Sequence, residues 1–214
     1  MNKLGKTGRG LYWFFSFVIV ALALRWLFGG VEATIPAMVY HLEERALYLF
    51  THMLASILPM ALIPLQLSNR FRARHPRWHR RLGWVALAGV FIGGLALFPL
   101  AANQPLPAWG RAGFMFSGTV WIGSAVIGLW HVLRGDIRRH RWWMTVTAAV
   151  IFGAVTQRFA LPFWIGLGYE FKTAYSLSAW VASPVNLGLL FLWQSRRRLR
   201  GLLRVRPVAG GRAD

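Results

Sequence analysis

The sequence predicts an all-α polytopic membrane protein with six transmembrane helices in one bundle, and three observations support this prediction. Of the 214 residues, 56% are apolar and only 14% are charged, whereas a soluble domain carries about 25% charged residues. Apolar runs of about 20 residues, the length that crosses a bilayer, recur along the chain. Most lysines and arginines lie between and beyond these runs, where they set membrane topology.

The six spans follow one another closely, so residues 1–194 are predicted to form a single transmembrane domain. The first span follows a short basic leader, and its apolar run is long for a cleaved signal peptide, so we expect it to be retained. Pro105, Pro107 and Gly110 mark a turn-rich loop between the third and fourth spans. The predicted spans are residues 11–28, 45–67, 82–102, 114–133, 142–165 and 175–194.

Residues 31–44 are too polar to cross a membrane and too short to form a domain. They contain Glu32, His41, Glu43 and Glu44. An outer metal site or proton-entry site would use such residues, but we expect a solvated helix at the membrane interface. Arg25, near the end of the first span, is expected to extend its guanidinium to the same interface.

The distribution of lysine and arginine predicts the orientation in the membrane. The leader has three, the loop between the second and third spans six, the loop between the fourth and fifth spans four, and the tail seven, which together are 20 of the 25. Six spans place these four segments on one side, so we expect a bacterial cytoplasmic (inner) membrane protein with both termini in the cytoplasm. Residues 195–214 are predicted to form a basic, partly disordered cytoplasmic tail.

The predicted partners follow from the same distribution. The net charge of +19 would suggest nucleic acid binding in a soluble protein. Because these arginines flank apolar spans, we expect contact with the bilayer and with anionic lipid headgroups instead, and no nucleic acid.

The composition also excludes several kinds of site. The chain has no cysteine, which excludes disulfides, thiolate metal sites, iron–sulfur clusters and covalently attached haem. Neither a serine–histidine–carboxylate constellation of a hydrolase nor a phosphate-binding glycine loop is recognisable. The sequence does not decide whether the protein is an enzyme.

A polar stripe runs along the second span, and a stripe of small residues runs along the third. A lipid-facing helix has no use for polar residues, so the second span is predicted to face other helices or a wet cavity. Small residues let helices approach closely. The polar stripe comprises His41, Arg45, Tyr48, His52, Ser56, Pro59 and Gln66, and the small stripe comprises Gly83, Ala86, Val90 and Gly93.

Four histidines lie within or beside consecutive spans, namely His52, His79, His131 and His140. Imidazole is the usual axial ligand of haem b, which needs no cysteine. His52, His79 and His140 are therefore candidate ligands of a haem iron, and His131 is a weaker candidate for cofactor binding. The alternative is a structural role, since histidines near the cytoplasmic face also contact lipid headgroups.

Arg158 is the other unusual residue, because it lies inside the fifth span at much the same depth as His52. No acidic residue lies within any span. Its partner would be a carbonyl, a polar side chain, a haem propionate or a quinone oxygen, or it extends toward the outer headgroups. We predict one outer site formed by His52 and Arg158, and an inner site formed by His79 and His140.

Three short motifs carry a resemblance to a known family. They are Pro64-Leu65-Gln66, His79-Arg80-Arg81-Leu82-Gly83, and Asp136 followed by His140-Arg141-Trp142-Trp143-Met144, with Arg158 and Pro162 beyond them. This pattern resembles a bacterial family of predicted membrane proteins that is catalogued only as a domain of unknown function, over roughly residues 45–195.

The family's pattern has a histidine that matches His52, and His131 lies outside it. The resemblance implies an architecture and candidate positions, Gln66 among them, and it implies no reaction. The bundle is also loosely similar to the di-haem cytochrome b group, which places two ligands on one helix. This chain departs from that arrangement.

Three functions remain open from the sequence. The first is a redox protein that binds haem b or a quinone and exchanges electrons with a partner. The second is small-molecule or proton-coupled transport or binding, with His52 and Arg158 lining a path. The third is a structural or accessory membrane subunit, in which the polar stripe serves packing alone.

Overall fold

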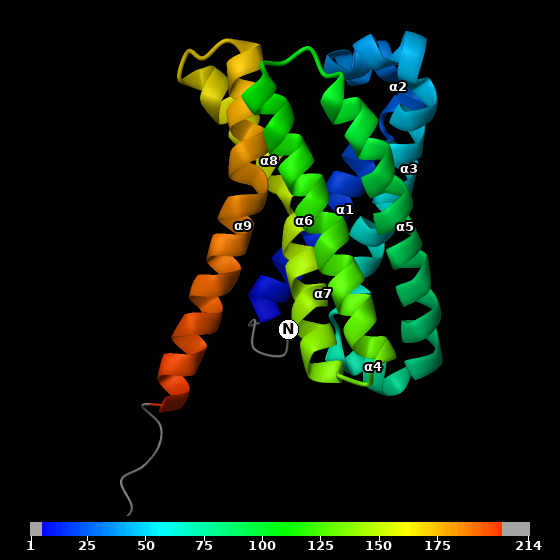
Figure 1. The fold of residues 1–214 in the computed structure, drawn as a ribbon, viewed down its shortest axis with the longest axis vertical. Coiled ribbons are helices and arrows are strands. Elements are labelled where there is room, and N and C mark those ends of the chain that lie inside the picture. Colours follow the sequence, from blue (N-terminus) through cyan, green and yellow to red (C-terminus); the bar gives the residue numbers. More distant parts are fainter. Residues whose placement is uncertain (1–5, 203–214) are drawn as a thin grey trace, which may run out of the picture.

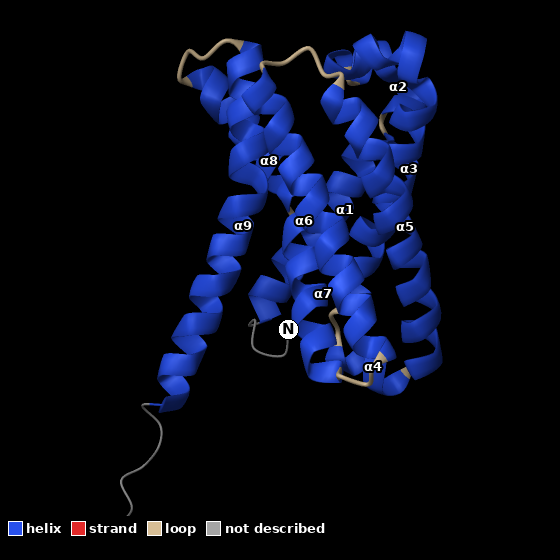
Figure 2. Ribbon diagram, in the orientation of Figure 1, coloured by secondary structure: helices blue, strands red, loops and turns tan. Residues whose placement is uncertain are grey.

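The computed structural model describes residues 6–202, in which helices joined by short loops are the only regular secondary structure (Figures 1 and 2). Within these residues, five helices are long and apolar enough to cross a membrane, or six if the bent pair α1–α2 counts as one span. The predicted polytopic all-α bundle is therefore confirmed. The helices are α1 (Lys6–Leu24), α2 (Trp26–Thr34), the 3₁₀ helix η1 (Pro36–His41), α3 (Leu42–Gln66), α4 (Asn69–Arg74), α5 (Pro76–Ala102), α6 (Ala108–Leu133), α7 (Ile137–Ile151), α8 (Gly153–Gly166) and α9 (Phe171–Leu202).

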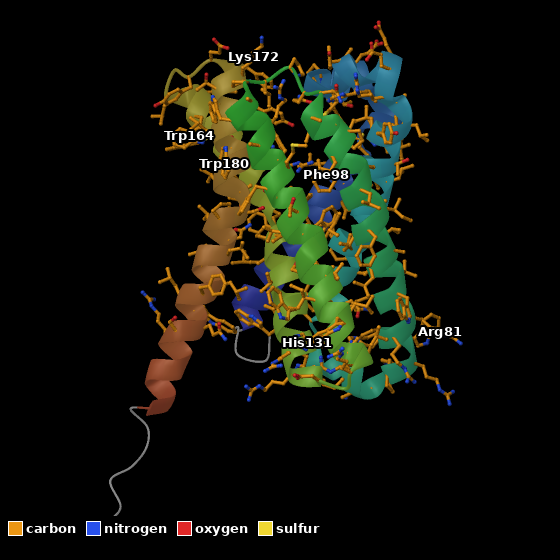
Figure 3. All side chains as sticks on the ribbon, viewed as in Figure 1. Arg81, Phe98, His131, Trp164, Lys172 and Trp180 are labelled. Carbon is orange, nitrogen blue, oxygen red and sulfur yellow. The ribbon has the colours of Figure 1, made fainter. Side chains whose placement is uncertain are left out.

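The two ends of the bundle differ in charge. The lower end in Figure 1 holds the start of α1, the short helix α4, the α6–α7 loop and the last turns of α9. The upper end holds α2, η1, the α5–α6 loop and the α8–α9 loop. Figure 3 shows Arg81 and His131 at the lower end and Lys172 at the upper end. The described parts of the basic segments thus all lie toward the lower end, as the spacing of the spans predicts.

A seam of small residues joins α3 to α5. A Cβ atom added to Gly89 would lie 2.6 Å from the backbone oxygen of Ala55, and one added to Gly93 would lie 2.7 Å from Ser56 Oγ. Val90, between these glycines, is buried. The small stripe predicted for the third span therefore faces a helix, and its glycines let two backbones approach closely.

The first predicted span, residues 11–28, is broken. Helix α1 ends at Leu24, and α2 continues from it after a bend of 74°. The Arg25 guanidinium donates to the Thr34 carbonyl oxygen, and Gly30 adopts a φ of 71°, which favours glycine. The exposed Arg25 therefore bridges the two sides of this bend at the upper end.

Other helix ends also differ from the predicted spans. Helix α5 begins at Pro76, a residue suited to the first helical position, so the His79-Arg80-Arg81 motif is helical and not in a loop. The fifth span is divided into α7 and α8 around Phe152. Helix α9 extends to Leu202 and includes the first part of the predicted tail. The rest of that tail, 203–214, lies outside the described residues.

The burial of two residues of the predicted polar stripe, His41 and Tyr48, differs from the prediction. His41 is fully buried, and its Nε2 donates to Gln104 Oε1 over 2.5 Å. This bond ties η1 to the α5–α6 loop, so His41 is not on a solvated helix. Tyr48 is 46% exposed, so it does not face the interior of the bundle.

Candidate functional site

A cavity of about 310 Å³ lies in the upper half of the bundle, and we refer to it as the upper cavity. Helices α1, α3, α5, α6, α8 and α9 contribute to its wall, which is mostly apolar. The volume is near the lower limit of ligand pockets, about 300–1,000 Å³. Polar residues interrupt the wall at Arg25, His52, Ser56, Gln104, Ser117, Gln157, Arg158, Tyr175 and Ser183.

His52 reaches the upper cavity from α3 with a fixed ring orientation. Its Nδ1 lies 2.8 Å from the Gly93 carbonyl oxygen. A carbonyl oxygen only accepts hydrogen bonds, so Nδ1 carries the hydrogen and, in the neutral ring, Nε2 holds the lone pair. Ser56 Oγ lies 3.4 Å from the same Nδ1. The seam of small residues between α3 and α5 permits this hydrogen bond, because a larger residue at Gly93 would push α5 away from α3.

Arg158 reaches the same cavity from α8. One guanidinium nitrogen donates to the Ala154 carbonyl oxygen in its own helix, over 2.8 Å. None of the described carboxylates forms an ion pair with it. It is close enough to Tyr175 and Arg25 for electrostatic interaction. Because guanidinium has five N–H donors, Arg158 can donate to a ligand in the cavity while keeping its helix contact.

The structure places the two predicted outer residues, His52 and Arg158, around one cavity. They belong to different helices, α3 and α8, yet their charges are close enough to interact. Together they offer a nitrogen lone pair and, on the exposed side chain of Arg158, a permanent cation at the wall of a mostly apolar cavity. This arrangement suits a small molecule with an apolar body and a carbonyl or anionic oxygen.

Sequence reasoning missed several residues of the upper cavity. Tyr175 begins a predicted span and is buried here, where it lines the upper cavity together with Gln157. Gln104 belongs to a loop rich in turn residues, and Arg25 to a span end. None of them lies on a helical stripe, so periodicity carried no signal for them.

The lower end holds a second group of polar side chains, which includes the predicted inner histidines. His140 Nδ1 donates to the Gly128 carbonyl oxygen over 2.9 Å, the same kind of bond that orients His52. His79 is close enough to His140 and Arg72 for electrostatic interaction. Gln66 approaches α5 so closely that a Cβ added to Gly83 would lie 3.4 Å from its Oε1.

His131 belongs to neither group. It is buried, and its Nδ1 lies 3.9 Å from Asp136 Oδ2. Asp136 caps α7 by accepting from the backbone N–H of Arg139 over 2.9 Å. This hydrogen bond, with the nearby positive charge of Arg139, holds the pKa of Asp136 below its usual value. The geometry therefore gives His131 a structural role at the α6–α7 turn and separates it from the other candidate ligands.

Apolar side chains fill the section between the two polar groups. On α3, Met60 and Ile63 lie between His52 and Gln66 and are buried in the main core. The same core includes Val90 on α5, and beside it the buried hydroxyls of Ser124 and Thr147, 2.9 Å apart, join α6 to α7. Two separate polar sites, and not one continuous polar stripe, therefore describe the bundle.

The described residues do not form a metal site made of side chains alone. Within the described residues, no group of three or more histidine or acidic side chains is placed to hold an ion. His52, His79 and His140 could serve a metal only one or two at a time, as axial ligands do.

Comparisons with known proteins agree with the architecture. The sequence model of a family described as "Predicted membrane protein (DUF2306)" matches residues 49–194, which confirms the resemblance and includes His52, His79, His140 and Arg158. The apolipoprotein N-acyltransferase of Gloeobacter violaceus is 32% identical over 135 residues, which are 58% of this chain and 24% of that protein. The chain thus spans about a quarter of that relative's length. No solved structure matches the chain significantly.

Proposed function

Since the chain belongs to the DUF2306 family of predicted membrane proteins, whose description states a location and no activity, we propose a function from the geometry. The protein binds a quinone, or a molecule of the same chemistry, in the upper cavity. The observation that carries this proposal is the placement of His52 and Arg158 around one mostly apolar cavity of about 310 Å³.

The chemistry of the cavity wall matches a quinone. A quinone headgroup is a flat apolar ring with two carbonyl oxygens, and its tail would lie outside the cavity. Arg158 donates hydrogen bonds to a carbonyl oxygen at any physiological pH. His52 is oriented by Gly93, so its Nε2 accepts from a quinol hydroxyl when neutral and donates to a quinone oxygen when protonated. Both the oxidised and the reduced ring therefore find partners.

Haem b is the second candidate, because a histidine with its Nδ1 bonded to a backbone carbonyl is oriented as metal-ligating histidines are. His52 and His140 both show this bond. Each would supply one axial nitrogen at its own site, and a haem bound there would supply electron-transfer chemistry. The upper cavity, at about 310 Å³, is smaller than a haem with its propionates, which is why we place haem second.

Two other activities receive less support. Transport needs a polar connection between the two ends, and Met60, Ile63 and Val90 fill the middle with apolar side chains. Acyl transfer, named in the relative from Gloeobacter violaceus, needs an activated nucleophile. The Nδ1 of His52 is already bonded to Gly93, so it does not activate the hydroxyl of Ser56. If the protein binds no ligand, we would conclude that it is a structural subunit.

The proposed location is the bacterial inner membrane, with the lower end of the bundle in the cytoplasm. Topology reporters fused after Ala102 and after Gly168, both at the upper end, are expected to read as external, because the loops at that end carry few basic residues. A reporter fused after Gly135, in the basic α6–α7 turn, serves as the cytoplasmic control. A cytoplasmic signal from Ala102 or Gly168 would contradict the orientation.

The quinone proposal is tested on protein purified in a mild detergent. We expect solvent extraction and mass spectrometry to recover quinone in an amount approaching one molecule per chain, with no haem absorption band in the visible spectrum. A b-type haem spectrum would favour the second candidate. Colourless protein that retains no quinone, and binds none when it is added, would contradict both.

A further inference from the structure

Side chains from the four helices α3, α4, α5 and α7 lie near one another at the lower end without an acidic partner. We call this group the lower cluster, and it consists of Gln66, Asn69, Arg72, His79, His140 and Arg141. The ion pairs of the described residues involve Glu44 and Asp136 as the acids, and neither pairs with Arg72 or Arg141. The lower cluster therefore concentrates positive charge that the described side chains do not neutralise.

Two guanidinium groups in the lower cluster converge on one neutral oxygen. Arg72 donates to Asn69 Oδ1 within α4, and Arg141 donates to the same oxygen from α7 over 3.2 Å. Burial first, and then the charge of Arg141, lowers the pKa of Arg72 below its usual value. An amide oxygen carries no net charge, so it does not offset the repulsion between two cations.

Further polar atoms lie in the lower cluster without hydrogen-bond partners among the described residues, one of them an amide donor and the other an imidazole nitrogen that donates when it carries the ring hydrogen. The Nδ1 of His79 and the Nε2 of Gln66 are both buried and form no hydrogen bond there. Buried polar groups are usually paired, so each unpaired one calls for an explanation. An oxygen-rich anion would accept from both and would also neutralise the two guanidinium groups.

We propose that the lower cluster is a binding site for a phosphate-type oxyanion. An arginine guanidinium binds phosphate through two parallel N–H···O bonds. The guanidinium groups of Arg72 and Arg141 already lie close together, because both donate to Asn69 Oδ1. The lower cluster forms where α3 ends and where α5 and α7 begin, at the edge of the apolar spans. This is the depth of lipid headgroups, so the phosphate of an anionic phospholipid is the favoured source, and a soluble phosphate is the other.

The proposal is tested with the full chain in nanodiscs of phosphatidylcholine containing a small fraction of phosphatidylglycerol. Native mass spectrometry measures the affinity for retained phosphatidylglycerol. We expect the double variant Arg72→Gln/Arg141→Gln to bind it at least about a hundredfold more weakly, since each arginine loses a charge-assisted hydrogen bond to the phosphate, about tenfold or more apiece. The matched control, Arg77→Gln/Arg80→Gln, removes two exposed arginines from the start of α5 and is expected to change affinity by less than about threefold.

A second arm distinguishes the source of the anion. In nanodiscs of phosphatidylcholine alone, inorganic phosphate is added and the thermal midpoint is measured. If inorganic phosphate raises the thermal midpoint of the control but not of the double variant, the site binds a soluble phosphate. If phosphate has no such effect and only phosphatidylglycerol binding depends on the two arginines, the site binds a lipid headgroup. Either result supports the site. Equal behaviour of the double variant and the control in both arms would overturn it.

Folding is controlled separately. If Arg72→Gln/Arg141→Gln aggregates, Arg141→Gln alone is used, because Arg141 is exposed and its replacement spares the interior. Quinone content is measured on the same samples and is expected to stay unchanged. Failure of the oxyanion site and failure of the quinone site are therefore read independently.

Discussion

Protein carrying His52→Ala or Arg158→Ala is expected to lose at least about nine tenths of its affinity for quinone while remaining folded. Each change removes a hydrogen bond in which a charged or titratable group meets the ligand inside an apolar cavity, worth about 1.5–3 kcal/mol. Affinity is measured by quinone titration of the purified protein. Thermal unfolding is measured in parallel, so that loss of binding is separated from loss of structure.

The controls for these variants are chosen by residue type. His75→Ala and Arg77→Ala remove an exposed histidine and an exposed arginine from the lower end, and neither is expected to alter quinone affinity. If His52→Ala and Arg158→Ala bind quinone normally, the upper cavity is not the site. If His79→Ala and His140→Ala reduce binding instead, the site lies at the lower end. If all four only lower thermal stability, these residues serve packing.

The second large effect is expected at the glycine seam. A Cβ atom at Gly89 would lie 2.6 Å from the Ala55 backbone oxygen and 2.6 Å from Pro59 Cδ. These atoms belong to the backbone and to a rigid ring, so α3 and α5 must separate. We expect Gly89→Ala to destabilise the protein by about 1–3 kcal/mol, as overpacking does in tightly packed interiors. Quinone affinity is expected to fall with it, because the Gly93 carbonyl would move away from His52.

The control for Gly89 is another helical glycine. A Cβ atom added to Gly123, in α6, would lie more than 4 Å from every atom of the surrounding residues. Gly123→Ala is therefore expected to leave stability unchanged or to raise it by up to about 1 kcal/mol, through helix propensity. Thermal unfolding of both variants in the same detergent measures the difference. Equal midpoints for Gly89→Ala and Gly123→Ala would show that the seam is not tightly packed.

The parts of the fold that sequence reasoning predicted depend on local patterns. Length and apolarity identify the spans because a bilayer sets both. The stripe of Gly83, Ala86, Val90 and Gly93 indicated a contact face because small residues recur at helical spacing. The shared depth of His52 and Arg158 could be counted along their spans, and the structure places both at one cavity.

What sequence reasoning could not predict depends on contacts between distant segments. The bend after α1 depends on Arg25 reaching Thr34, and apolarity continues through it. His41 is buried because Gln104, 63 residues later, accepts its hydrogen bond. Tyr48 shares a helical face with His52 in projection, yet it is exposed, since a wheel does not show where the neighbouring helices end.

The position of α1 has a consequence for the order of assembly. Its rings pack on residues made much later, with Tyr12 stacked on Phe152 at 5.2 Å and Phe15 edge-on to Phe159 at 5.9 Å. At about 5–20 residues per second of synthesis, α1 waits on the order of ten seconds in the bilayer before these partners exist. Helices α3 and α5 are separated only by the short helix α4, so they can pair soon after synthesis. The wall that carries Arg158 and Tyr175 is synthesised last, so the upper cavity is complete only after α8 and α9 have joined the bundle.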